Sequence, residues 1–420
     1  MILLIRPFIQ YFNLINLENL NKILVQNRFP KPDFESGYVY PEQNFFTPNE
    51  ALWSYIDIAI LVLLMGFVTW AVIKKQVRWP IMLTSVVSIA YFGFFRHGCV
   101  CSIGAIQNVS LALASNSYTI PLFVLLLFVL PIIFTLFFGR VFCAGVCPLG
   151  ALQEVVNIKN YKLSKVVTSV LGIFPWIYLG FAVLFAVTNS RFIICRYDPF
   201  IGIFRLGGEF PLIVFGVLLL IISIFTGRPF CRFLCPYGAI LSLFSRISFR
   251  QIKITKKECV NCQLCHNACP VDAIHPPYEN KVKESRDVGV KRLLRYLVFL
   301  PLMITAGIVV MLILSDKFSR ANNAVQLYDM VLEKEARPQA VQSLELQAFY
   351  SRERTVAELA VQVEEIKRSF STYSGIIGAF FGLIIGLTLI SLSTKRTRKH
   401  YEIKSADCVS CGRCFKYCPK

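Results

Sequence analysis

Two short stretches of the chain repeat one cysteine spacing, C-x2-C-x2-C-x3-C-P. The first reads Cys259-Val-Asn-Cys262-Gln-Leu-Cys265-His-Asn-Ala-Cys269-Pro, and the second reads Cys408-Val-Ser-Cys411-Gly-Arg-Cys414-Phe-Lys-Tyr-Cys418-Pro. Three cysteines spaced by two residues wrap a short loop around one [4Fe–4S] cluster, while the fourth ligates a neighbouring cluster. The spacing therefore predicts two redox clusters.

The alternatives for these eight cysteines are a structural zinc or disulfides. Zinc sites usually pair one C-x2–4-C with a distant second pair, so a run of four close cysteines followed by proline suits zinc poorly. Cross-ligation predicts one cluster held by Cys259, Cys262, Cys265 and Cys418, and another held by Cys408, Cys411, Cys414 and Cys269. His266 lies among these ligands and is expected to tune or shield a cluster.

A second repeat carries four more cysteines. The fourteen residues from Gly139 to Leu152 match those from Gly227 to Ile240 at eight positions, 88 residues apart. Each copy contains C-x3-C-P at the inner end of an apolar stretch, and residues four apart share one helix face. Two copies related by a pseudo-two-fold axis along the membrane normal would gather four thiolates, from Cys143, Cys147, Cys231 and Cys235.

The remaining three cysteines lie at the outer ends of apolar stretches. The run from Cys99 to Val109, with Cys101, resembles the run from Cys147 to Val155, and Cys195 follows the fourth apolar stretch. The same pseudo-symmetry predicts that Cys99, Cys101 and Cys195 converge on an outer site, with His97 or Asp198 as a fourth ligand.

Plainer readings of the seven membrane cysteines stay open. Buried cysteine often serves only as a small hydrophobe, and outer thiols facing an oxidising compartment can form a disulfide. Arginines flank the cysteines, where their charge could offset that of thiolate-bound clusters or simply mark a membrane boundary. They are Arg96, Arg140, Arg196, Arg228 and Arg232.

The elements that position these residues are apolar helices. The chain is 55% hydrophobic, with a mean hydropathy of +0.58. Seven stretches approach the ~20 residues needed to cross a bilayer, at about 53–73, 80–96, 119–138, 167–188, 211–226, 293–314 and 374–393. The expected fold is an α-helical integral membrane protein of about seven transmembrane helices. It contains two pseudo-symmetric hairpin repeats (80–150 and 167–240) and a small split 2[4Fe–4S] ferredoxin-like domain on the cytoplasmic side.

The order of segments predicts five regions. Residues 1–52 are an N-terminal interfacial or extracytoplasmic segment, and 53–250 are the membrane domain. Residues 251–290 are the first ferredoxin half, 291–395 a transmembrane hairpin with an extracytoplasmic helical insert (315–373), and 396–420 the second half. Two spans between the halves return the second to the side of the first.

Basic residues predict the orientation. With both ferredoxin halves in the cytoplasm, the inside segments hold 28 of the 44 Lys and Arg residues, as the positive-inside rule requires. The net charge of +19 thus indicates membrane orientation rather than nucleic-acid binding. We expect a multi-pass protein of the bacterial inner membrane.

These motifs together resemble the membrane polyferredoxins of the NosR/NapH/CcoG group. The similarity to NosR-like proteins is greatest between about 90 and 270, in Phe95-Arg-His-Gly-Cys99-Val-Cys101, Gly139-Arg-Val-Phe-Cys143, Cys195-Arg-Tyr-Asp198-Pro-Phe200 and Arg232-Phe-Leu-Cys235-Pro-Tyr-Gly238. The resemblance implies electron transfer linked to the quinone pool or to periplasmic redox enzymes, and roles in copper-enzyme assembly. NosR-like relatives often carry a periplasmic flavin domain before the first span. Residues 1–52 are too short for one, so flavin is expected to be absent or held by a partner.

The resulting functional hypothesis is transmembrane electron transfer. Clusters at the inner face, the inner helix ends and the outer helix ends would form a ladder across a hydrocarbon core of ~30 Å, connecting cytoplasmic or quinol donors to a periplasmic redox partner. The chain would be an electron-transfer subunit of an oxidoreductase complex. Alternatives are a quinol dehydrogenase, a metal-ion (copper) reductase, or an assembly or regulatory factor for a periplasmic metalloenzyme.

Overall fold

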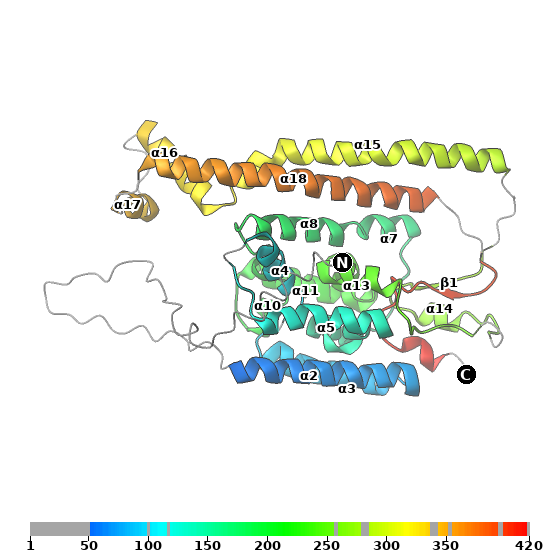
Figure 1. Ribbon diagram of the computed structural model, residues 1–420. Coiled ribbons are helices and arrows are strands. Elements are labelled where there is room, and N and C mark those ends of the chain that lie inside the picture. The colour runs from blue at the N-terminus through cyan, green and yellow to red at the C-terminus, as the bar shows by residue number, and fades with distance from the viewer. Residues whose placement is uncertain are drawn as a thin grey trace, which may run out of the picture. The chain divides into compact units, whose positions relative to one another are not determined.

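The computed structural model describes residues 51–98, 101–115, 118–255, 259–278, 285–336, 343–351, 355–393 and 398–417. The expected segment before residue 51 lies outside this part of the chain. The described residues are mostly helical (Figure 1). The first half contains α2 (Ala51–Trp70), η3 (Ala71–Lys75), α3 (Trp79–Ser88), η4 (Ile89–Phe95), α4 (Ala105–Ala114), α5 (Leu122–Phe138), η5 (Phe142–Val146), α6 (Pro148–Val156), α7 (Lys165–Leu171), α8 (Phe174–Val187), α9 (Ile193–Arg196) and α10 (Ile201–Phe204).

The second half contains the remaining membrane helices and the ferredoxin elements. These are α11 (Phe210–Phe225), α12 (Pro229–Phe233), α13 (Pro236–Ser245), α14 (Leu264–Ala268), β1 (Ile274–His275), α15 (Arg286–Ser319), α16 (Asn323–Ala336), α17 (Leu344–Tyr350), α18 (Val356–Ser393), β2 (Glu402–Ile403) and η6 (Arg413–Lys416).

Helices occupy all seven ranges in which spans are expected. Four are long and apolar enough to cross a membrane, namely Leu52–Lys75, Lys165–Val187, Arg286–Ser319 and Val356–Ser393. The other three are shorter apolar helices, Trp79–Phe95, Leu122–Phe138 and Phe210–Phe225. The described chain is therefore a helical membrane protein with four candidate spans. Helix α18 runs through residue 373 as one continuous helix, so no helix end marks the expected boundary between the insert and the last span.

After several of the longer helices, a short helix runs back alongside them. Helices α6 and α13 each begin at a proline directly after a motif cysteine, where the missing N–H and fixed φ of proline favour the first helical turn. The Tyr237 hydroxyl donates to Phe128 O in the middle of α5, whereas the Phe249 amide donates to Leu136 O near its end. Helix α13 therefore runs alongside the second half of α5, and its first turn lies well inside the layer.

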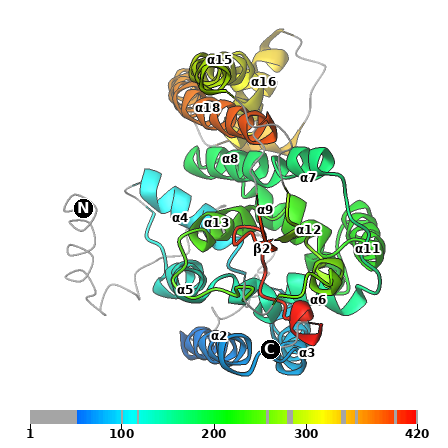
Figure 2. The same ribbon diagram turned by 90° about the vertical axis from the view of Figure 1, so that its right-hand side faces the viewer.

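The long helices α15 and α18 pack against each other through glycine and join the rest through α8 (Figures 1 and 2). A Cβ at Gly307 would overlap Gly378 O, and a Cβ at Gly382 would overlap Met303 O. Such close approach of two backbones is typical of small-residue interfaces between membrane helices.

The ferredoxin elements lie at one end of the helices, and α16 and α17 lie at the other (Figure 1). Strand β1 pairs antiparallel with β2, with Ile274 opposite Ile403, so the two cysteine motifs meet in one small unit although α15 to α18 separate them. The insert helices have a core of their own, formed by Val325, Val331, Leu346, Phe349, Leu359 and Val363.

Candidate iron–sulfur sites

The second ferredoxin motif surrounds a cavity together with a cysteine of the first. Cys408, Cys411 and Cys414 line it with Cys269, and its empty volume is about 350 Å³, open solvent included. Cys414 also lies within electrostatic range of Cys265. This is the arrangement expected from cross-ligation, with the last cysteine of one motif placed among the first three of the other.

The two motif loops share one backbone conformation. Asn261 and Gln263 have φ of 55° and 64°, and their counterparts Ser410 and Gly412 have φ of 52° and 71°. Three of these are not glycine, and left-handed φ is uncommon for such residues. The repeated pattern therefore indicates a conformation imposed by what each loop encloses. Cys418, expected to complete the first site, lies outside the described residues.

Burial of the ferredoxin thiols disfavours a bare thiolate. Burial raises the pKa of Cys408 to about 11 and that of Cys411 to about 12, since a charged sulfur loses its hydration. Burial also lowers the pKa of His275 below its usual value. Buried thiols of this kind fit ligands whose charge is neutralised by bound iron. His266 does not point its Nδ1 at a sulfur: that atom lies 2.6 Å from Ile274 O.

The four inner cysteines come together. Cys147 lies within electrostatic range of Cys143, Cys231 and Cys235, and all four are buried. Cys147 and Cys235 are the capping residues of α6 and α13, and the Gly238 amide lies 3.3 Å from the Cys235 sulfur. The positive ends of two half-helices thus face this site, an arrangement that favours an anionic ligand.

The outer set is partly described. Cys101 lies within electrostatic range of Cys195 and Asp198, and a Cβ at Gly104 would be 3.1 Å from the Cys195 sulfur. Asp198 is buried and accepts the Phe200 amide at 2.9 Å. His97 is exposed and does not line the cavity to which Cys101 and Asp198 both contribute, and which of His97 and Asp198 completes the set stays a prediction. Cys99 lies outside the described residues.

Two glutamines that the sequence patterns did not single out give the inner and outer sites the same internal support. Gln153 Oε1 accepts the amide of Phe230, just before Cys231, and Gln107 Oε1 accepts the amide of Ile194, just before Cys195. Both side chains are fully buried. Their signal was in the sequence, since they occupy matching places in the runs after Cys101 and Cys147.

One difference between the two glutamines bears on whether the outer site holds a cluster. The Gln153 amide nitrogen is 3.6 Å from the Cys231 sulfur, whereas the Gln107 amide nitrogen is buried without a hydrogen-bond partner in the described chain. A buried donor without an acceptor is costly. The outer site therefore has the thiols, the carboxylate and the spare donor that suit a bound anionic metal cluster.

The arrangement suits a cluster better than a single ion. Among the described residues, no three His, Cys, Asp or Glu side chains are placed to hold one metal ion. Each iron of a cubane takes its own cysteine, so its ligands surround a volume rather than a point. No described cysteine forms a disulfide.

The inner and outer sets are direct neighbours. A second cavity, also of about 350 Å³ with open solvent included, is lined by Cys101 and Asp198 on one side and by Cys147 and Phe142 on the other. Phe200 of the outer loop stacks edge-on against Phe230 of the inner motif, with ring centroids 5.2 Å apart. The two sets therefore lie closer together than their expected placement at opposite helix ends implies.

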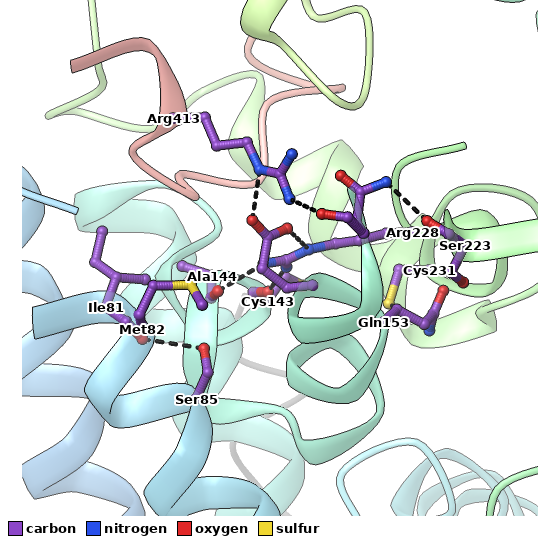
Figure 3. Close-up of polar contacts among 12 residues, drawn as sticks. Ile81, Met82, Ser85, Cys143, Ala144, Gln153, Ser223, Arg228, Cys231 and Arg413 are labelled. Carbon is purple, nitrogen blue, oxygen red and sulfur yellow. Dashed lines mark hydrogen bonds and ion pairs between the residues drawn. The ribbon is translucent and has the colours of Figure 1, made fainter. Parts of the chain in front are cut away.

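Sequence analysis also missed the polar contacts that connect the inner set to the second ferredoxin loop. Glu154 of α6 binds both Arg228, beside the inner motif, and Arg413, between Cys411 and Cys414 (Figure 3). No pattern of spacing pointed to Glu154, because its partners come from segments 74 and 259 residues away.

Two families described as 4Fe–4S binding domains match the chain. One covers residues 120–165 and 209–257, the two halves of the inner repeat, and the other covers 252–275, the first ferredoxin motif. These matches confirm the expected cofactor type, the [4Fe–4S] cluster.

Several known proteins are similar to parts of the chain. An uncharacterised protein of Methanocaldococcus jannaschii is 30% identical over 190 residues, which is 43% of this chain and 77% of the relative. The regulatory protein NosR of Stutzerimonas stutzeri is 36% identical over 156 residues, 34% of this chain and 21% of NosR. The ferredoxin-type protein NapH of Haemophilus influenzae is 29% identical over 158 residues, 35% of this chain and 53% of NapH. No solved structure matches.

Proposed function

Since the chain belongs to the NosR/NapH type of membrane polyferredoxin, we propose that it carries electrons across the membrane. The donor would be cytoplasmic or a quinol, and the acceptor a periplasmic redox protein in the same complex. One relative is named a ferredoxin-type protein and another a putative electron transport protein. The match spans only about a fifth of NosR and half of NapH, so donor, acceptor and complex are part of the proposal.

The observation that supports it is the continuity of the four cysteine sets. The outer and inner sets share one cavity, Arg228 lies within electrostatic range of both Cys231 and Cys411, and Cys414 lies near Cys265. Each set thus shares a cavity with the next or has groups within electrostatic range of it, from the outer loops to the first ferredoxin motif. Unrelated buried cysteines would have no reason to form such a series.

In this proposal each cysteine set holds one [4Fe–4S] cluster, which supplies one-electron redox chemistry at a potential set by its surroundings. Asp198 would complete the outer set, and Cys418 the first ferredoxin set. The chain's own residues bury the ligands, keep water out and direct half-helix N-termini at them. These are the features by which proteins set cluster potentials.

The proposed orientation places the ferredoxin unit in the cytoplasm and the insert of α16 and α17 outside. It follows from the basic residues of the ferredoxin end and from seven crossings. The three shorter apolar helices, of 16 or 17 residues, lie at or just below the short end of the range for spans. The insert would then face periplasmic partners.

A regulatory role is the second candidate, because the NosR relatives of Stutzerimonas stutzeri and Pseudomonas aeruginosa bear the name regulatory protein. A regulator would need its clusters to sense redox state without passing electrons outward. The outer cysteines distinguish the two functions, since conduction across the membrane needs them and sensing at the cytoplasmic face does not.

The experiment that tests the proposal is iron and acid-labile sulfide analysis of anaerobically purified protein, with spectroscopy to identify the cluster type. Four cubanes give about 16 iron per chain, and this is the expected result. About 12 iron, unchanged by Cys195→Ser, would leave the outer set without a cluster and favour the regulatory role. About 8 iron would restrict the redox function to the ferredoxin unit.

A further inference from the structure

One carboxylate at the boundary between the membrane helices and the ferredoxin unit binds three guanidinium groups. Glu154 Oε1 lies 2.7 Å from Arg413 Nε and 3.1 Å from Arg78 Nη2, and Glu154 Oε2 lies 3.0 Å from Arg228 Nε. The four side chains are called the Glu154 junction below. Figure 3 shows Arg413 and Arg228 with this carboxylate between them.

Two of the arginines connect the junction to cysteine-bearing backbone. Arg228 also donates to the carbonyl oxygens of Cys143 and Ala144, in the inner motif. Arg413 lies between Cys411 and Cys414 and donates to Asn157 O at 3.2 Å. The junction therefore connects the inner cysteines to the second ferredoxin loop directly, by side chains rather than through the intervening helices.

The junction is buried and carries excess positive charge. The side chains of Arg228, Glu154 and Arg413 are 0%, 2% and 9% exposed, and only Arg78 reaches 33%. A single carboxylate faces three guanidiniums, each of which stays protonated. Buried charge is expensive unless compensated, so the surplus is explained best by negative charge close by. The flanking thiolate sets, once loaded, provide it.

The junction is absent from the second repeat. The residues 88 positions after Gln153 and Glu154 are Leu241 and Ser242, although the cysteines, the glycine and the arginine of the motif are kept. Arg140, the counterpart of Arg228, instead donates to Ala406 O in the second ferredoxin half. The symmetry of the repeat is broken where the ferredoxin loop contacts the membrane helices, which indicates a role at that contact.

We propose that the Glu154 junction positions the second ferredoxin loop against the inner cysteines and, by its surplus positive charge, raises the reduction potential of the clusters on both sides. The proposal rests on cluster binding by these two sets in the proposed function. The contacts of Glu154, Arg228 and Arg413 described above are to carboxylate and carbonyl oxygens rather than to cysteine sulfur, so these three are positioning residues. Adding an electron to a cluster adds negative charge, which nearby guanidiniums stabilise.

The test compares two variants that remove charges of opposite sign. Arg413→Gln removes a positive charge and should lower the potential, whereas Glu154→Gln removes the negative charge and should raise it. The readout is a potentiometric titration of the full chain followed by electron paramagnetic resonance. We expect shifts in the ratio of reduced to oxidised cluster of about tenfold, which is ~59 mV for a one-electron couple. Lys367→Gln, which breaks a surface pair with Asp316, is the charge control and should leave the potentials unchanged.

A purely structural role predicts a different pattern. Both variants would then loosen the loop and lose iron together, with no opposed shifts, and this result would overturn the electrostatic part of the proposal. If either variant fails to bind its clusters, Arg413→Lys is the second variant, because it keeps the charge but loses the planar guanidinium. It should keep the reduction potential, while hydrogen exchange of residues 404–417 increases. Unchanged exchange in Arg413→Lys and in Arg413→Gln would overturn the positioning part. A wild-type chain lacking the inner cluster by iron analysis would instead contradict the proposed function.

Discussion

At the scale of single residues, cysteine spacing predicts the ligands but not the groups that support them. The spacing of Cys259 to Cys269 can be recognised within one short stretch of sequence. The role of Gln153 depends on its contact with the amide of Phe230, 77 residues away, which only the folded chain shows. Repetition supplied the one available signal, since Gln107 and Gln153 follow equivalent cysteines. No such repetition pointed to Glu154, because its partners are determined by how three distant segments pack.

The buried glutamines lead to a first prediction. Gln153→Leu leaves the Phe230 amide buried without an acceptor and should destabilise the protein by about 1–3 kcal/mol, with partial loss of iron from the inner set. Thermal unfolding in detergent and iron analysis measure both effects. Gln347→Leu, at an exposed position of α17, is the matched control and should change neither. Equal stability of the two variants would show that the Gln153 contact contributes little.

The outer ligand set leads to a second prediction. Asp198→Asn keeps an oxygen for the Phe200 amide but removes the carboxylate, so the iron content should fall by about four per chain. His97→Gln alters an exposed side chain and should retain the full iron content. The reverse result, iron lost in His97→Gln and retained in Asp198→Asn, would reassign the fourth ligand to His97.

At the scale of elements, the positions of the long apolar helices were predictable and the half-helices were not. Apolar length identified all seven ranges, because burial in lipid demands a continuous run. A helix of nine or ten residues such as α6 or α13 gives no such signal, and the proline at its start is equally consistent with a turn. The re-entrant course of α13 appears only from the contacts of Tyr237 and Phe249 with α5. That course brings the inner and outer cysteines to one cavity.

The glycine contact between α15 and α18 leads to a third prediction. Gly382→Leu places a side chain against the α15 backbone at Met303 and Ile304, so it should separate the helices and cost at least about 1–3 kcal/mol. Because these helices connect the two ferredoxin halves, iron from the cross-ligated clusters should fall as well. Gly289→Ala is the control on α15, since a Cβ there has nothing within 4 Å. Thermal unfolding that is unaltered in Gly382→Leu would rule out tight packing at this point.

At the scale of the whole molecule, the ferredoxin unit is assembled from two halves that only the folded chain brings together. Sequence predicted this union from an even number of intervening spans, and β1 pairs with β2 as that union requires. What sequence could not supply is the distance between neighbouring cysteine sets, which depends on the depth of each loop in the helix layer. The continuity of the series is thus a property of the tertiary structure, and it makes a directional test possible.

The last prediction concerns conduction across a sealed membrane. In vesicles with the ferredoxin unit outward, dithionite added outside should reduce ferricyanide trapped inside faster than in protein-free vesicles, because electrons enter at the ferredoxin end and leave at the outer loops. Cys195→Ser, beside Cys101 in the outer set, should lower the rate to the protein-free background while the ferredoxin clusters remain reducible from outside. Lys367→Gln should conduct as the wild type does. A Cys195→Ser rate equal to wild type would mean that electrons bypass the outer set, whereas a wild-type rate equal to background would favour a sensor whose clusters exchange electrons only at the ferredoxin end.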